Sequence, residues 1–131
     1  NALEERGILQ FVVSNKIGIT LRKEAKKLAV DNKFFSLIGS LDGAADKPSA
    51  APVELALMGS GLDPKKDVIW FIGDTIVDVN CARNSGCYPL VFSDSPQQVS
   101  STISREEFLG NGDESAILPL YFNHQELVDL I

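Results

Sequence analysis

Residues 68–78 read Val-Ile-Trp-Phe-Ile-Gly-Asp-Thr-Ile-Val-Asp, an apolar run that ends abruptly in a glycine, two carboxylates and a hydroxyl. An uninterrupted apolar run of this kind is typical of a strand buried on both faces, as in a parallel sheet covered by helices. Its polar end would then lie at the carboxyl edge of the sheet, where open α/β folds bind their ligands. The stretch therefore predicts a fold class and the sheet edge that carries a site.

Asp74 and Asp78 lie four residues apart at this edge and suggest a site for a hard cation with oxygen ligands, with Mg²⁺ as the best candidate. A simpler interpretation covers part of the pattern, because Thr75-x-x-Asp78 is also a capping box for a helix that runs to Gly86. The capping and metal-binding roles of Asp78 are compatible. Capping leaves Asp74 as an unpaired charge at the end of a buried strand, which is costly without a partner. We therefore expect Asp74 to bind the metal.

Strands and helices alternate along the rest of the chain. Apolar residues at helical spacing, with lysines between them, predict a helix over residues 21–29, and Ser49 is suited to cap the next helix. This alternation is typical of a doubly wound, Rossmann-like parallel sheet in an α/β fold. The expected strands are residues 8–13, 34–38, 68–73, 88–92 and 118–122. The expected helices are residues 2–7, 21–29, 49 to either 59 or 61, 75–86, 104–109 and 125–131.

Composition excludes several classes of function. The chain has 131 residues, is 44% hydrophobic and shows no membrane span or signal peptide, which suits one soluble, cytoplasmic domain or most of one. A net charge of -6 without a basic stripe argues against a nucleic-acid surface, and the basic residues 22–27 are interpreted as a solvated helix face. Cys81 and Cys87 lack a metal or redox spacing, and His124, the only histidine, has no Gly-x-Ser-x-Gly elbow to accompany it.

Two further polar pairs occur at expected strand or helix boundaries: Ser14-Asn15 after the first strand, and Lys47-Pro48 before the second full helix. A hydroxyl, an amide and an ammonium group bind phosphate oxygens, while carboxylates hold a cation that neutralises charge in phosphoryl transfer. In isolation, Ser14 and Asn15 also fit a turn, and Lys47 also fits a surface lysine. Combined with the acidic motif, the two pairs predict a phosphate pocket.

The order, spacing and residue types of these motifs resemble the haloacid dehalogenase-like (HAD) hydrolase superfamily, in particular its phosphoglycolate-phosphatase-like branch. The resemblance is most specific over residues 71–86. It implies that Ser14 is the phosphate-binding residue of the second motif, that Lys47 is the lysine of the third motif, and that both bind phosphate and take part in catalysis. It also implies substrate contact for Asn15 and magnesium binding for Asp74 and Asp78.

The first motif of the family, Asp-x-Asp, is absent from these 131 residues. In the family its first aspartate is the nucleophile and a magnesium ligand, and its second is the general acid and base. Asp42 and Asp46 are too far apart to substitute, and Asp94 has no second aspartate two residues later. The resemblance places the missing strand between the strands that end at Ser14 and Asp74. Without it, both strands would expose unpaired edges and apolar side chains.

We therefore expect residues 1–131 to form the C-terminal portion of a single HAD-like core domain that lacks its central first strand and its cap. The start at Asn1 rather than at a methionine agrees with this expectation. The expected activity of the whole protein is magnesium-dependent hydrolysis of a small phosphate monoester through an aspartyl-phosphate intermediate. The missing N-terminal fragment, or a partner subunit, would complete the site, and the chain alone is expected to be inactive.

Two alternatives remain open from the sequence. One is a non-catalytic, degenerate HAD-like module that keeps the pocket for binding. The other is a HAD-type phosphomutase or phosphonatase, since cap residues normally choose between these reactions. Dehalogenation is the least favoured, because Asp74 and Asp78 favour a cation that displacement of halide does not require. The sequence does not specify the substrate or the oligomeric state.

Overall fold

The computed structural model describes residues 2–92 and 120–122. The chain divides into two units, Asn1–Asp63 and Pro64–Ile131, each of which we describe by itself. Two expected helices, over residues 104–109 and 125–131, lie outside the described residues, as does His124. The expectation of a single core domain stays a prediction.

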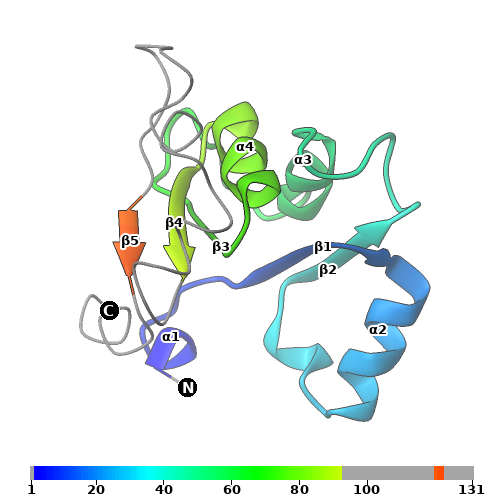
Figure 1. The fold of residues 1–131 in the computed structure, drawn as a ribbon. Helices are drawn as coiled ribbons and strands as arrows, with labels where there is room; N and C mark the ends of the chain where they lie inside the picture. Colours follow the sequence, from blue (N-terminus) through cyan, green and yellow to red (C-terminus); the bar gives the residue numbers. More distant parts are fainter. Residues whose placement is uncertain (1, 93–119, 123–131) are drawn as a thin grey trace. The chain divides into compact units, whose positions relative to one another are not determined.

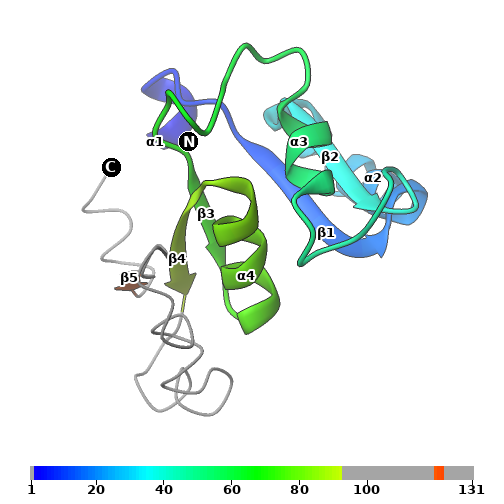
Figure 2. The ribbon, with the colours of Figure 1, turned by 90° about the horizontal axis from the view of Figure 1, so that it is seen from above.

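The first unit is a pair of parallel strands with helices packed on both faces (Figures 1 and 2). α2 is the crossover between β1 and β2, and α2 and α3 contact both strands from opposite sides. The elements are α1 (Ala2–Glu5), β1 (Phe11–Ile17), α2 (Gly18–Lys27), the 3-10 helix η1 (Asp31–Lys33), β2 (Ser36–Ser40) and α3 (Ala51–Leu57). Its buried apolar side chains are Ala25, Pro52, Val53, Ala56 and Leu57.

β1 leaves regular pairing near its carboxyl end. Pairing with β2 stops at Val13 and resumes only at Ile17, so residues 14–16 stand opposite Gly39 alone. The expectation that the strand ends at Ser14 is therefore wrong, because the chain stays extended through this irregular stretch. Such a bulge re-aims side chains and is common beside functional sites.

The second unit is a parallel three-stranded sheet in the order β3-β4-β5. Its elements are β3 (Trp70–Gly73), α4 (Ile76–Ser85), β4 (Tyr88–Phe92) and β5 (Leu120–Phe122). α4 is the crossover from β3 to β4 and packs on both strands (Figure 2). It ends at Ser85, and the next residue, Gly86, has a left-handed φ of 79°, a conformation that glycine adopts without steric cost. The buried apolar residues described here are Val79, Cys81, Ala82, Cys87, Pro89, Leu90 and Val91.

Among the described residues all three strand pairs are parallel, with α2 joining β1 to β2 and α4 joining β3 to β4. This arrangement confirms the α/β, Rossmann-like fold class. Among the helices of residues 2–92, none combines the length and the hydropathy that a membrane span requires.

β3 is partly exposed, whereas its apolar sequence predicts burial on both faces. Trp70 and Ile72 are each 44% exposed and point to the same side of the strand, and Val68, two residues before the strand, is 74% exposed. Within the described part of the chain, β3 pairs only with β4, and β1 only with β2. The prediction of full burial is wrong, because an apolar run does not reveal whether a neighbour is present. Among the described strands, β1 and β3 thus each pair on one side only, as expected for strands that lack a neighbour.

Candidate functional site

The turn between β3 and α4 is built around the Asp78 carboxylate. Its Oδ2 accepts hydrogen bonds from the Asp74 amide at 3.2 Å, the Thr75 amide at 3.3 Å and the Thr75 hydroxyl at 3.1 Å. The Thr75 side chain in turn accepts a bond from the Asp78 amide, so the predicted capping box is confirmed. Asp78 is 8% exposed, and its charge is therefore stabilised by the donors that surround it.

Gly73 has a steric role in the same turn. A Cβ atom at this position would overlap the Cβ and the carboxyl group of Asp78. The order Gly-Asp-Thr-x-x-Asp thus follows from the local structure, because the glycine makes room for the carboxylate that organises the next two amides.

Asp74 lies directly after β3, and its side chain is exposed. The sequence argument that Asp74 is an unpaired charge in a buried setting is therefore wrong, because water solvates this carboxylate. The carboxylates of Asp74 and Asp78 still fit a magnesium ion, which usually takes one or two carboxylate ligands and completes its coordination shell with water and substrate phosphate. Within residues 2–92 and 120–122, no three carboxylate, histidine or cysteine groups gather as metal ligands.

We predict that the capping box contributes to the stability of the second unit. Thr75→Ala is expected to lower the free energy of unfolding by about 1 kcal/mol. Asp78→Ala is expected to cost about 2 kcal/mol or more, because it leaves the Asp74 and Thr75 amides without their acceptor. Urea unfolding measures both values, with Asn80→Ala inside α4 as the control. A loss for Asp78→Ala no greater than that of the control would contradict this account of the turn.

In the first unit, the Asn15 side chain contacts the Lys47 backbone, and the Ser14 hydroxyl contacts the Lys16 amide. The Asn15 side chain donates from Nδ2 to the Lys47 carbonyl at 3.3 Å and accepts at Oδ1 from the Lys47 amide at 3.0 Å. The Ser14 hydroxyl oxygen accepts from the Lys16 amide at 3.1 Å. Lys47 is half-buried and precedes Pro48 across a cis peptide bond. Asn15 therefore anchors the segment of Lys47 to the end of β1.

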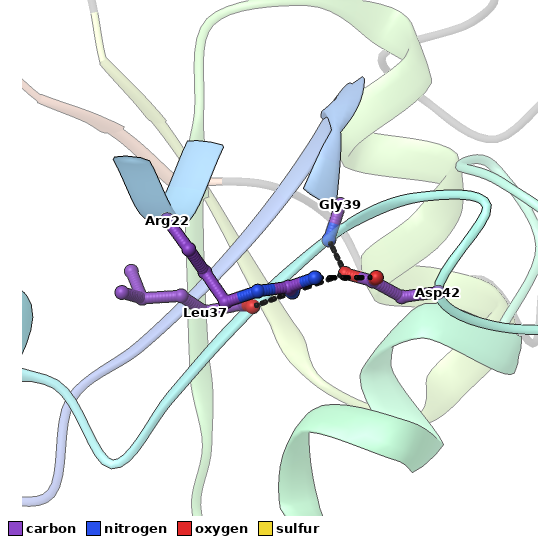
Figure 3. Close-up of polar contacts among 4 residues, drawn as sticks. All are labelled: Arg22, Leu37, Gly39 and Asp42. Atoms are coloured by element: carbon purple, nitrogen blue, oxygen red, sulfur yellow. Dashed lines mark hydrogen bonds and ion pairs between the residues drawn. The ribbon is translucent and has the colours of Figure 1, made fainter. Parts of the chain in front are cut away.

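Arg22 and Asp42 form a bidentate ion pair in this unit (Figure 3). Arg22 Nη1 donates to Asp42 Oδ2 at 2.7 Å and to the Leu37 carbonyl at 3.1 Å, while Nη2 donates to Asp42 Oδ1 at 3.0 Å. The Gly39 amide also donates to Asp42 Oδ2, at 2.7 Å. The predicted solvated face of residues 22–27 is largely exposed, but its sequence gives no sign of this pair. No local pattern connects two residues that are 20 positions apart.

The pair shifts the ionisation of both groups. The Arg22 guanidinium, through its hydrogen bonds, and then the Gly39 amide hold the pKa of the Asp42 carboxyl below its usual range, against the opposing effect of desolvation. The hydrogen bonds to Asp42 likewise raise the pKa of Arg22. Both groups are therefore charged at neutral pH.

Stability is expected to depend on pH through Asp42. Folding lowers the pKa of Asp42. Its contribution to the free energy of unfolding is therefore fully present above the unfolded pKa of about 4 and is lost as the pH falls through the folded pKa. The difference in free energy of unfolding between the natural sequence and Asp42→Asn should be constant from pH 7 to 5. It should shrink below about pH 4. A difference that persists unchanged to pH 3 in chemical unfolding would contradict the assignment.

The predicted site residues thus fall into two groups. The first unit contains Ser14, Asn15 and Lys47, and brings Asn15 together with Lys47. The second unit contains Asp74 and Asp78 and brings these two together. Ser14 and Asn15 lie in the irregular carboxyl half of β1, and Lys47 lies in the loop after β2. Asp74 directly follows β3. The carboxyl ends of parallel strands are where open α/β folds commonly bind ligands.

Comparison with known proteins identifies the family. Residues 1–91 match the haloacid dehalogenase-like hydrolases, and the chain belongs to this family. Phosphoglycolate phosphatases from Mannheimia succiniciproducens and Pasteurella multocida are 33% and 32% identical to it over 85 residues, or 65% of the chain. The chain spans 37% of the length of each of these relatives.

Solved structures agree with this assignment. A HAD-superfamily hydrolase from Ehrlichia chaffeensis is 32% identical, with a TM-score of 0.74 over 98% of this chain and 52% of its own. A predicted phosphoglycolate phosphatase from Haemophilus somnus is 28% identical, with a TM-score of 0.63 over 70% of this chain and 40% of its own. The resemblance to the phosphoglycolate-phosphatase-like branch, stated from the motifs, is thereby confirmed.

Proposed function

We propose that the protein is a magnesium-dependent phosphatase that acts on a small phosphorylated metabolite. The observation that carries this proposal is the turn after β3, where Asp78 fixes two consecutive amides and leaves Asp74 exposed at the end of a parallel strand. Similarity to two phosphoglycolate phosphatases supports a phosphate monoester as substrate, with a phosphorylated short-chain acid as the first candidate.

Each group of residues has a role in this proposal. Asp74 and Asp78 would hold the magnesium ion, which supplies positive charge to offset the charge that develops on the transferred phosphoryl group. Ser14 donates its hydroxyl hydrogen to a phosphate oxygen, and the Lys47 ammonium pairs with a second oxygen. Asn15 has both of its amide atoms bonded to the Lys47 backbone, so its contribution to substrate binding is to hold that segment in place.

The nucleophile belongs, in this proposal, to a segment that precedes Asn1 and carries an Asp-x-Asp motif. Its first carboxylate attacks phosphorus and forms an aspartyl phosphate, while the ester oxygen leaves with a proton from the second aspartate. Water then cleaves the acyl phosphate, which releases inorganic phosphate and regenerates the carboxylate. Three observations support such a segment: the chain has no Asp-x-Asp, β1 and β3 each pair on one side only among the described strands, and the phosphoglycolate phosphatases are longer. We place the reaction in the cytoplasm.

The test uses the intact protein, by which we mean residues 1–131 together with the residues encoded before Asn1. Release of inorganic phosphate from phosphoglycolate and other small phosphate monoesters is measured with Mg²⁺ and with a chelator. We expect turnover that requires the metal and is highest for one of the short phosphorylated acids. Isomerisation of a sugar phosphate without phosphate release would favour a mutase, and binding without turnover of any substrate would favour a non-catalytic module.

A further inference from the structure

We propose that the Arg22–Asp42 ion pair is a positioning latch, which fixes the loop over residues 41–47 and thereby sets the place of Lys47 beside the end of β1. This inference rests on the proposed phosphate-binding role of Lys47 and deepens it. Its basis is a series of contacts that run from α2 through the loop to Lys47, all within the first unit.

The latch begins with a carboxylate enclosed on several sides. Asp42 bonds Arg22 through both oxygens and the Gly39 amide through one, and its side chain is 18% exposed (Figure 3). Gly18, the first residue of α2, lies against this carboxylate, because a Cβ atom at Gly18 would overlap the Asp42 carboxyl group. The loop is thus bound to the start of α2 and to the end of β2.

The backbone beside the latch is strained. Leu41 has a φ of 71° and a side chain that is 80% exposed. A leucine in the left-handed region is sterically unfavourable, and an exposed side chain gains little packing in return. The Asp42 contacts hold this conformation, since the turn at Leu41 directs Asp42 back toward Gly39 and Arg22.

Further bonds carry the constraint along the loop to Lys47. The Ser40 hydroxyl donates to Asp46 Oδ2 at 2.9 Å, and the next residue, Lys47, exchanges two hydrogen bonds with Asn15. The loop is therefore held by contacts at Asp42, Asp46 and Lys47. Of these contacts, only that of Asp42 is a bidentate ion pair, so its loss is expected to increase the mobility of the loop most.

The experiment compares Asp42→Asn, Arg22→Met and Arg22→Lys in the intact protein. Glu24→Gln is the matched control, because Glu24 lies on α2 like Arg22 and forms an exposed ion pair with Lys16 of β1. Hydrogen exchange of the Lys47 amide, followed by NMR, is expected to accelerate about tenfold in Asp42→Asn and Arg22→Met, while amides of the β1–β2 ladder are unchanged. The dissociation constant for inorganic phosphate is expected to rise about tenfold in the same variants.

Arg22→Lys keeps the charge but loses the planar fork, so it should fall between the natural sequence and Arg22→Met in both measurements. Unchanged exchange at Lys47, an equal increase throughout the first unit, or the same phosphate affinity in Glu24→Gln and Asp42→Asn would overturn the proposal. Phosphate binding by the unsubstituted protein tests the proposed function separately. If that protein binds no phosphate, the exchange of the Lys47 amide still decides whether the latch exists.

Discussion

Asp74→Asn in the intact protein is expected to lower magnesium-dependent phosphate release by at least about 100-fold, because it removes the exposed carboxylate that we assign to the metal. Stability should barely change, since the contact of Asp74 with the capping box is made by its amide and not by its side chain. The measurement is kcat/KM at several Mg²⁺ concentrations, together with thermal unfolding.

Asp31→Asn is the control for this substitution, since it removes an exposed aspartate of the 3-10 helix in the first unit. We expect its kcat/KM to equal that of the natural sequence. Full activity of Asp74→Asn with an unchanged dependence on magnesium would show that the metal, if one is used, is held elsewhere.

Gly39→Ala is expected to have the largest effect on folding. A Cβ atom at this position would meet Gly18 Cα at 2.6 Å and Gly18 N at 2.7 Å, and would also collide with the Lys16 carbonyl oxygen. All three are main-chain atoms, so no side-chain rotation relieves the overlap. We expect the free energy of unfolding to fall by about 3 kcal/mol. This value is at the upper end of the usual cost of overpacking, because the overlap is with fixed backbone atoms. The same change displaces the Gly39 amide from Asp42.

Gly43→Ala, in the loop that follows, is the matched control. Its Cβ atom would have Leu55 Cδ2 as its nearest neighbour at 3.4 Å, an ordinary contact with a side chain. Its change in stability should stay within about 0.5 kcal/mol. Chemical unfolding of both variants tests the close approach of β2 to the start of α2, and equal stabilities would contradict it.

Local patterns in the sequence were sufficient for the parts of the structure that depend on near neighbours. The capping box of Thr75 and Asp78, the left-handed end of α4 at Gly86, and the helical phase of α2 each arise within a few residues. The Ser49 hydroxyl accepts from the Ala51 amide at 3.1 Å, one residue before the N-cap at Ala50. The local chemistry was therefore right, although the assigned helix boundary differs by one residue.

Features that depend on distant residues were not predictable in this way. The burial of β3 was overestimated, because it depends on a neighbouring strand that its own apolar residues do not specify. The bulge after Val13 depends on the register with β2. The Arg22–Asp42 pair depends on how α2 and the loop after β2 fold together, so the basic run around Arg22 predicts its exposure but not its partner.

In the candidate site too, local motifs predicted the residues but not all of their contacts. The sequence motifs selected Asp74 with Asp78 and Asn15 with Lys47, and the structure brings each of these pairs into contact. The contacts themselves add what the motifs did not contain. Asp78 is a buried organiser of the turn, and Asn15 is bonded to the backbone of Lys47.

The central claim is that these residues serve a phosphatase whose nucleophile lies before Asn1. Its most direct test compares magnesium-dependent phosphate release by the 131-residue chain and by the intact protein, at equal concentration and with mass-verified material. We predict turnover by the intact protein and none by the chain alone. Turnover by the isolated chain, or an intact protein that carries Asp-x-Asp and releases no phosphate from any monoester, would contradict the account.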